Sequence, residues 1–314
     1  TRLAEQEIKV LCIAGNHDSA VRLAFGAQLL QSSGVHIAGT LDAAAAPVVL
    51  SDAFGDVYFS LLPYGDPPHV REAFSLDETP SFDTALDVQI AASRTMIPQG
   101  ARSVAVAHAF VIGGQTSESE HTLSVGGSDQ VHADKFRPYN YTALGHLHAP
   151  QRAGMEQVRY AGSLLKYSFD ESHQKKGVTL VDIDAAGAVS HTFYPLTPRH
   201  DVRIVRGKIA EIMSDGFDPL SHEDYICVEL TDTEPVLAAH EKLRRVYPNL
   251  FLITRPNIHV GHSSNEVRNY ERGKSDLHLF ADFYAEMTTE EMTQEETEEL
   301  THIIDALERE ERMQ

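Results

Sequence analysis

The sequence predicts an α/β protein, and the alternation of two patterns along its first 196 residues is the main reason. Short apolar runs of strand length recur, at 8–14, 35–39, 46–51, 56–63, 102–108, 141–145, 157–161, 177–183 and 188–195. Three segments have the apolar spacing of helices, at about 19–31, 68–75 and 83–97. With 314 residues, 42% of them hydrophobic, the chain can form one large domain and a smaller one.

Polar side chains that could bind a metal follow three of these strands. The run IKVLCIAGNHDS places Asn16 and His17 after the first strand, and RSVAVAHAF ends its strand on His108. NYTALGHLHA runs into His146 and His148, which are two residues apart and can point to one side of an extended backbone. Three strand ends with such side chains predict one polar centre.

A structural role is the alternative for each histidine, and for His108 alone it is the better interpretation. Burying both histidines of GHLH, however, costs free energy unless each has a partner, and GNHD adds a third polar site of the same kind. The remaining histidines that we weighed follow no strand-to-loop pattern and are expected to be ordinary core or surface residues: His36, His69, His121, His132, His173 and His191.

In this order, GNHD, a strand ending in His and GHxH resemble the second half of the calcineurin-like metallophosphoesterase signature. Four further segments resemble the SbcD-type nuclease subunits of bacterial SbcCD complexes: HAFVIGG at 108–114, LSVGGSD at 123–129, YTALGHLHAPQ at 141–151 and VRYAGSLLKYSFDE at 158–171. The resemblance implies a β-sandwich flanked by helices, with a small α+β capping domain and C-terminal helices.

The resemblance also implies roles for these residues around two Mn²⁺ ions, or Mg²⁺ in their place. Asn16, His108 and His146 would bind one ion and His148 the other, while His17 would act on the scissile phosphate as the catalytic residue. Nitrogen and amide oxygen ligands without a thiolate independently suit Mn²⁺, Fe²⁺ or Zn²⁺. Asp18 could orient His17 or cap the following helix, and capping is the more common role for Asp at that place.

The sequence departs from the family pattern at its start. The family carries Asp-x-His and Gly-Asp-x-x-Asp motifs that supply the remaining ligands and a bridging carboxylate, and neither precedes GNHD here. We therefore expect an N-terminally incomplete chain that lacks the first βαβ unit of domain 1–196. Activity of this polypeptide is then an open question.

Beyond Pro195 and Pro198 the pattern changes. Residues 199–257 read as strand, helix, strand, helix, strand and resemble the capping domain of the family. Residues 258–275 are polar and are expected to form a linker. Within 276–314, one apolar stripe runs through Leu277, Phe280, Ala281, Tyr284 and Met287, and a second through Leu300, Ile303, Ile304 and Leu307, after a capping box from Thr293 to Glu296.

The resemblance names SbcC, an ATPase with a long coiled coil, as the partner that such C-terminal helices would bind. A helical hairpin folded back on its own domain is the alternative, since an amphipathic stripe reports burial and not its location. The resemblance further implies DNA as substrate and a homodimer within a heterotetramer.

The net charge of −20 gives no support for tight DNA binding by this chain alone. Half of it lies in residues 281–314, which hold twelve acidic and two basic residues. Lys166, Lys175 and Lys176 could form a basic patch, although a solvated face is the more common arrangement. The segment 115–134, rich in Ser, Gly and Glu, is expected to be a loop that borders the site.

No apolar stretch is long enough to cross a membrane, and Cys12 and Cys227 lack disulfide or CxxC spacing, so a reducing, cytoplasmic location is expected. The favoured function is metal-dependent hydrolysis of DNA phosphodiesters, 3′ to 5′ on double strands and endonucleolytic on single strands and hairpins, in recombination, replication and repair. A small-molecule phosphodiesterase or phosphatase and a non-catalytic scaffold subunit are the alternatives.

Overall fold

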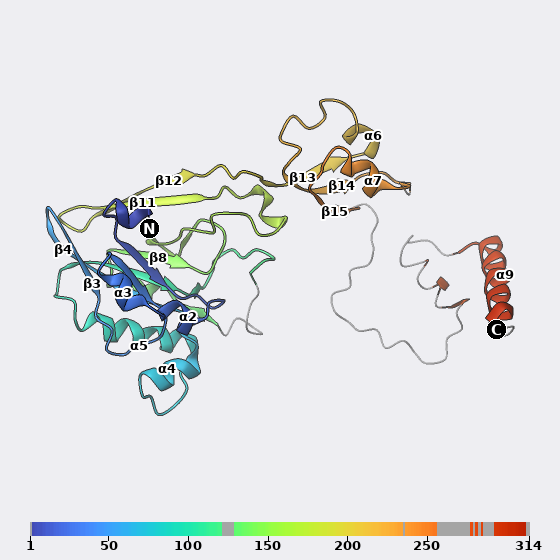
Figure 1. The fold of residues 1–314 in the computed structure, drawn as a ribbon. Helices are drawn as coiled ribbons and strands as arrows, with labels where there is room; N and C mark the ends of the chain where they lie inside the picture. Colours follow the sequence, from blue (N-terminus) through green and yellow to red (C-terminus); the bar gives the residue numbers. More distant parts are fainter. Residues whose placement is uncertain are drawn as a thin grey trace. The chain divides into compact units, whose positions relative to one another are not determined.

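The computed structural model describes residues 2–120, 129–234, 236–255, 277–278, 280–281, 284 and 292–311. Two compact units make up the chain, Thr1–Val202 and Arg203–Gln314. Each unit is described by itself, and Figure 1 shows its elements coloured along the sequence. None of the described helices is long and apolar enough to cross a membrane.

A six-stranded sheet forms the centre of the first unit, in the order β3-β4-β5-β8-β10-β9. Four neighbouring strands are parallel: β4 (Gly55–Leu62), β5 (Arg102–His108), β8 (Tyr141–Gly145) and β10 (Met155–Tyr160). The edge strands β3 (Val48–Asp52) and β9 (Gln151–Ala153) are antiparallel to their neighbours. Because the inner strands are parallel, their carboxyl ends lie at one edge of the sheet.

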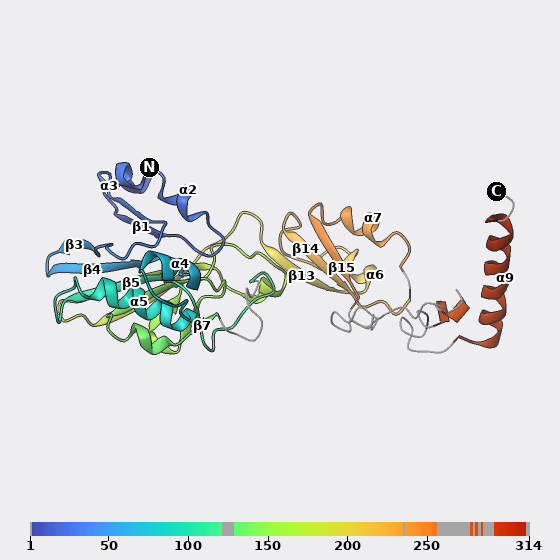
Figure 2. The same cartoon turned by 90° about the horizontal axis from the view of Figure 1, so that it is seen from below.

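Both faces of this sheet are covered, which explains why β5 is an almost continuous apolar run. On one face, Leu86 and Ile90 of α5 (Phe82–Arg94) pack with Ala105, Ala107 and Leu144. Figure 2 shows α5 alongside the sheet. Ser81 begins this helix, since its side chain accepts a hydrogen bond from the Thr84 amide at 3.1 Å.

The opposite face packs against a second sheet layer. The antiparallel strands β11 (Gly177–Ile183) and β12 (Val189–Pro195) contribute side chains that contact Val57, Val104 and Tyr141. Layers of sheet with helices outside them are the architecture expected of a calcineurin-like fold, and the predicted α/β class is confirmed.

A separate parallel pair, β1 (Val10–Ile13) and β2 (Val35–Ala38), carries the GNHD loop. The single helix predicted over 19–31 is wrong: the structure has α2 (Ala20–Ala24) and α3 (Ala27–Gln31). Gly26 lies between them with φ +75°, a left-handed conformation that no continuous helix contains. The Tyr64 amide donates to the Ala14 carbonyl at 2.9 Å and joins the end of β1 to the chain that follows β4.

Several short elements had no sequence prediction. They are α1 (Arg2–Glu5), β6 (Phe110–Val111), β7 (Gln130–Val131) and the 3₁₀ turns η1 (Ala133–Phe136) and η2 (Asp170–His173). The predicted helix at 68–75 is present as α4 (Pro67–Ala73). Two-residue strands and single turns leave no periodicity in a sequence, so they emerge only from tertiary contacts.

The second unit contains the predicted strand-helix-strand-helix-strand module. Its elements are β13 (Val202–Gly207), α6 (Ile209–Ile212), β14 (Tyr225–Leu230), α7 (Ala239–Arg244) and β15 (Leu250–Thr254), with strand order β13-β14-β15. Its core is built around fully buried Ile226, Leu230, Leu243 and Tyr247. The predicted linker 258–275 lies outside the described residues.

Of the first predicted C-terminal helix, Leu277, Phe280, Ala281 and Tyr284 are described and are helical, whereas Met287 lies outside the described residues. The second is α9 (Gln294–Glu311). Its predicted capping box is confirmed: the Glu296 amide donates to Thr293 Oγ1 at 3.3 Å, and the Thr293 amide donates to Glu296 Oε2 at 2.8 Å.

Candidate metal centre

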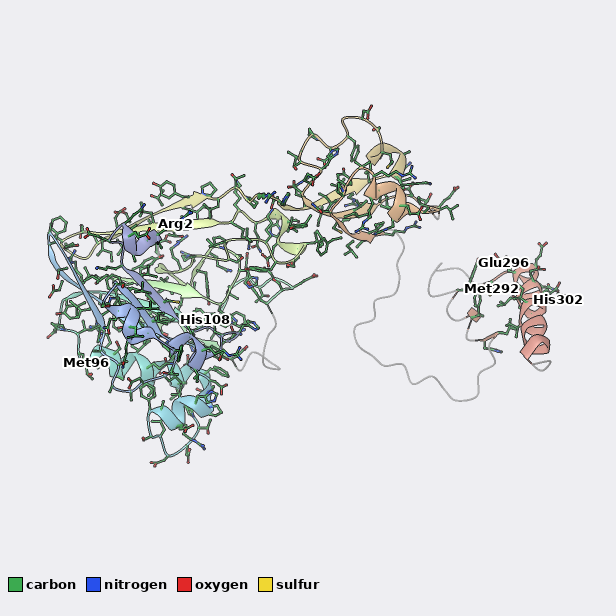
Figure 3. All side chains as sticks on the ribbon, viewed as in Figure 1. Arg2, Met96, His108, Met292, Glu296 and His302 are labelled. Carbon is green, nitrogen blue, oxygen red and sulfur yellow. The ribbon has the colours of Figure 1, made fainter. Side chains whose placement is uncertain are left out.

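Three of the predicted ligands meet where their strands end. Asn16 follows β1, His108 is the last residue of β5, and His146 follows β8. The register pairs His108 with Gly145, which places the next residue, His146, beside the His108 side chain. Figure 3 shows His108 among the side chains of the first unit.

The spacing of the donor atoms suits one metal ion. Asn16 Oδ1 lies 2.8 Å from His108 Nε2, and His146 Nδ1 lies 3.4 Å from the same nitrogen. Ligands of one ion with bonds of about 2.0–2.1 Å lie about 3 to 3.4 Å apart. Asn16, His108 and His146 therefore fit a single ion as two imidazole nitrogens and an amide oxygen.

Glycine makes this convergence possible. A Cβ on Gly15 would lie 2.6 Å from His108 Cε1, and a Cβ on Gly145 would lie 3.1 Å from His108 Nδ1. The glycines of GNHD and GHLH thus let both loops approach the His108 ring, a reason for those residues that the strand-end argument did not supply.

His146 has a left-handed backbone, with φ 121°. Such a conformation costs a non-glycine residue on the order of 1–3 kcal/mol and is retained where the surroundings impose it, often at functional sites. Here the ring stacks on buried Phe110, with centroids 5.5 Å apart, and meets His108 edge-on at 5.3 Å. The strain turns the His146 side chain toward its neighbouring ligands.

Burial keeps the two imidazoles neutral, which metal binding requires. Burial, followed by the neighbouring His146 and His17, lowers the pKa of His108 to about 4. The pKa of His146 is also lowered, chiefly by burial. Near pH 7 both rings are therefore available as donors without loss of a proton.

Two polar atoms at the site have no hydrogen-bond partner among the described residues, Asn16 Nδ2 and Asp129 Oδ1. Both are buried, an arrangement that costs free energy unless a ligand or ion completes it. Asp129 lines the same small cavity as Tyr64 and His108, and sequence reasoning missed it because SVGGSDQV carries no strand-end signal. Within the described residues, no group of three or more His, Cys, Asp or Glu side chains is arranged to hold a metal ion.

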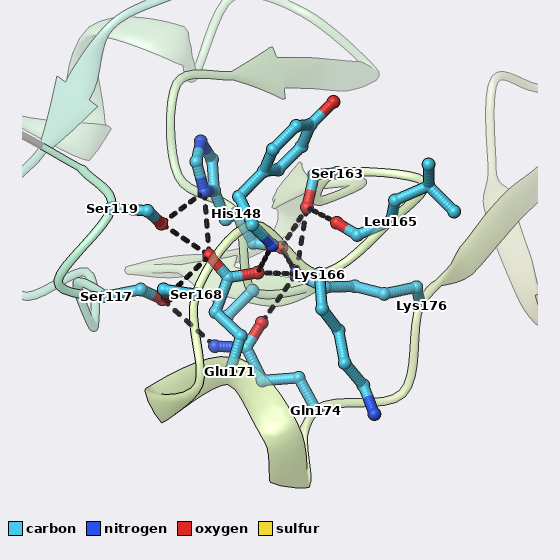
Figure 4. A network of polar contacts seen from close by, with 12 residues as sticks. Ser117, Ser119, His148, Ser163, Leu165, Lys166, Ser168, Glu171, Gln174 and Lys176 are labelled. Carbon is cyan, nitrogen blue, oxygen red and sulfur yellow. Dashed lines mark hydrogen bonds and ion pairs between the residues drawn. The ribbon is translucent and has the colours of Figure 1, made fainter. Parts of the chain in front are cut away.

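His148 lies in a different set of contacts from the other three. Its Nδ1 is 3.0 Å from Glu171 Oε1 and 2.9 Å from Ser119 Oγ, and its backbone amide donates to Glu120. Figure 4 shows the side-chain network around Glu171. These contacts confirm that part of the predicted 115–134 loop borders the site, while residues 121–128 lie outside the described part.

Two expectations about charged residues are wrong. Lys166 and Lys176 form neither a basic patch nor a solvated face, because their side chains are only 10% and 5% exposed and pair with Asp201 and Glu171. Asp18 does not cap α2; its Oδ2 accepts from the Gly15 amide at 2.7 Å, and the N-cap position belongs to Ser19. Asp18 therefore shapes the GNHD turn that presents His17.

A cleft opens beside that turn. It is lined by residues of the GNHD loop and of the segment from β4 to α4, among them Asn16, Asp18, Tyr64, Asp66 and His69. The ring of Tyr64 meets His108 edge-on at 6.0 Å, so the cleft reaches the candidate metal ligands.

The comparisons with known proteins agree with this arrangement. The family SbcD_C, described as "Type 5 capsule protein repressor C-terminal domain", matches residues 198–288. Over 300 residues the chain is 28% identical to a curated protein from Staphylococcus epidermidis (strain ATCC 12228 / FDA PCI 1200), which is named as the D subunit of the nuclease SbcCD; the match covers 96% of this chain and 79% of that protein. Together with the strand-end ligands, this similarity makes the chain an SbcD-like protein.

Proposed function

We propose that this chain is the nuclease subunit of an SbcCD complex, a hydrolase that cleaves DNA phosphodiester bonds with the help of divalent ions. The observation that carries the proposal is the convergence of Asn16, His108 and His146 within 3.4 Å at the ends of three strands. The similarity to a curated nuclease subunit over 96% of the chain supports the choice of substrate.

In this proposal Asn16, His108 and His146 hold one Mn²⁺ or Mg²⁺ and His148 contributes to a second. A divalent ion at such a site stabilises charge on phosphoryl oxygens and lowers the pKa of a bound water. His17 follows Asn16 on the same turn, where its imidazole can stabilise developing charge or give a proton to the leaving oxygen. The cleft beside the turn would receive the phosphodiester.

The acidity of the chain bears on how DNA is held. With a net charge of −20 and with Lys166 and Lys176 occupied by carboxylates, DNA affinity would come from the ions and from a partner more than from a basic surface. The name of the curated relative places it in a two-protein complex. We therefore propose SbcC as the partner, DNA as the substrate, and a homodimer within the complex.

The first test is the substitution His17→Ala, with exposed His240→Ala in α7 as a matched control. His17→Ala should abolish cleavage of a 3′-labelled DNA duplex in Mn²⁺ while leaving the number of bound Mn²⁺ ions near that of the unsubstituted chain, and the control should change neither. Loss of bound metal would instead make His17 a ligand. Hydrolysis of bis(p-nitrophenyl) phosphate without any cleavage of DNA would favour a small-molecule phosphodiesterase.

A further inference from the structure

Glu171 is a carboxylate at the centre of a dry polar network. Its side chain is completely buried, and it follows η2's first residue in the segment YSFDE. Oε2 pairs with Lys176 Nζ at 2.6 Å, while Oε1 accepts from Ser119 Oγ at 2.5 Å and contacts His148 Nδ1 at 3.0 Å. No strand-end or helical pattern marks this residue, and sequence reasoning assigned it no role.

The carboxylate decides which ring nitrogen of His148 carries the proton. Burial opposes its charge, yet hydrogen bonds from Lys176, Ser119 and His148 lower the pKa of Glu171 to about 2, so that it is an acceptor near neutral pH. A deprotonated Nδ1 would set its lone pair against an anionic oxygen 3.0 Å away. A proton on Nδ1 turns the same contact into a charge-assisted hydrogen bond.

Lys176 ties the carboxylate to the His148 backbone. Besides its ion pair, Nζ donates to the His148 carbonyl at 2.8 Å and to Ser163 Oγ at 2.8 Å. The Gly162 turn closes on the same carbonyl: a Cβ there would lie 2.7 Å from it. Ring and backbone of His148 are thus held by one buried ion pair, and Figure 4 shows the second ring nitrogen pointing away from the network.

We propose that Glu171 is a positioning residue which, with Lys176, holds His148 in the Nδ1-protonated tautomer and leaves Nε2 free to bind a metal ion. The inference rests on the proposed function for the identity of the ligand, Mn²⁺, but the tautomer itself is a property of the metal-free chain. A carboxylate behind a ligating histidine fixes the ring and raises its basicity as a donor.

The competing explanation is that Glu171 only neutralises buried Lys176. Two double variants separate these roles. Glu171→Leu with Lys176→Met removes both charges and the acceptor, whereas Glu171→Gln with Lys176→Met removes both charges but keeps an oxygen that can accept from Nδ1. Neither leaves a buried lysine without a counter-charge, the cost that would confound Glu171→Gln alone.

The tautomer is measured by ¹⁵N NMR of the metal-free, histidine-labelled chain, with the His148 signals identified by their loss in His148→Ala. Mn²⁺ affinity is measured by EPR titration. The Leu/Met variant should lose the fixed Nδ1–H pattern and bind Mn²⁺ about 10- to 100-fold more weakly at the site that uses His148. The Gln/Met variant should keep the tautomer and most of the affinity.

An unchanged tautomer and affinity in the Leu/Met variant would overturn the proposal and leave Glu171 a structural partner of Lys176. Should that variant not fold, the unsubstituted chain still decides the matter: a His148 proton on Nε2 in its spectrum contradicts the inference. Failure of the proposed function would look different, since Mn²⁺ would then not bind even where the Nδ1–H tautomer is present.

Discussion

His108 is the residue on which the candidate metal centre depends, because two loops close on its ring. Gly15→Ala would put a methyl group 2.6 Å from His108 Cε1, so either the ring or the GNHD turn must move. We expect Mn²⁺ affinity to fall at least tenfold, the size of effect seen when the support of a ligand is disturbed, which is about 10- to 100-fold. The measurement is an EPR titration of Mn²⁺ with the folded variant.

Gly100→Ala is the matched control for that substitution. Gly100 has φ +75° and no atom near its missing Cβ, so the change strains the backbone without touching His108. It should lower stability by about 1 kcal/mol and leave Mn²⁺ binding unchanged. Equal loss of Mn²⁺ affinity in both variants would mean that the tight packing of Gly15 on His108 is irrelevant to the site.

At this scale the sequence predicted the residues that share a simple rule and missed those that do not. Asn16, His108 and His146 all follow a buried parallel strand, so their meeting could be expected from the topology of such sheets. Glu171 and Asp129 come from irregular segments, and only the folded chain shows that they lie beside His148 and His108. The left-handed backbone of His146 likewise follows from its packing and from no local motif.

Among the elements, β10 is joined to the end of β5 by one phenol. Buried Tyr160 accepts from the Val111 amide at 2.8 Å and donates to the Ala109 carbonyl at 2.7 Å. Tyr160→Phe leaves both backbone groups without that partner, so we expect a loss of about 1–3 kcal/mol in the free energy of unfolding, measured by urea denaturation. Tyr141→Phe, on β8, is the control and should cost less than the Tyr160 change.

The second unit holds its strands with a buried charge cluster. Arg203 of β13 donates to Asp218 at 2.9 Å and to Asp224 at 2.7 Å, and Tyr247 Oη donates to Asp218 at 3.2 Å. Burial works against ionised Asp218, but the hydrogen bond from Arg203 and its other partners lower its pKa below the ordinary 3.8. Its contribution to stability is therefore present above pH 3.8 and is lost as the pH falls through the lower folded value.

Asp218→Asn tests this pH dependence. At pH 7 the variant should lose about 2 kcal/mol, since Arg203 then lacks a charged partner. The difference from the unsubstituted chain should shrink below pH 3.8, where Asp218 itself becomes protonated. Hydrogen exchange of the β14 amides (Tyr225–Leu230) measures both, and a difference that stays constant down to pH 2 would contradict the assignment.

Continuous or alternating apolar runs explain why the longer strands could be predicted to within a few residues. β5, β8, β11 and β12 match their predicted ranges because each is bounded by turn residues and packs on a covered sheet. The helix over 19–31 was mispredicted because apolar spacing continues through Gly26 while its left-handed backbone does not. Propensity alone cannot tell a tolerated helix glycine from a break.

For the molecule as a whole, the open question is what the acidic C-terminal helix binds. α9 carries Leu300 and Ile304 half-buried and Ile303 50% exposed, while the side chain of the fourth stripe residue, Leu307, lies outside the described part. An exposed apolar side chain on a helix rich in Glu is a candidate contact for a partner helix or groove. Deletion of residues 276–314 should therefore abolish co-purification with SbcC and spare Mn²⁺-dependent hydrolysis of a model phosphodiester.

A single substitution makes this test sharper than the deletion. Ile303→Glu changes the exposed stripe position, and His302→Glu adds the same charge at the adjacent exposed residue that is outside the stripe. If the stripe binds SbcC, Ile303→Glu weakens co-purification by more than about tenfold, equivalent to ~1.4 kcal/mol, while His302→Glu does not. If the stripe instead packs on its own chain, Ile303→Glu lowers the melting temperature and leaves co-purification intact, because burial and not partner contact is what the charge then disrupts.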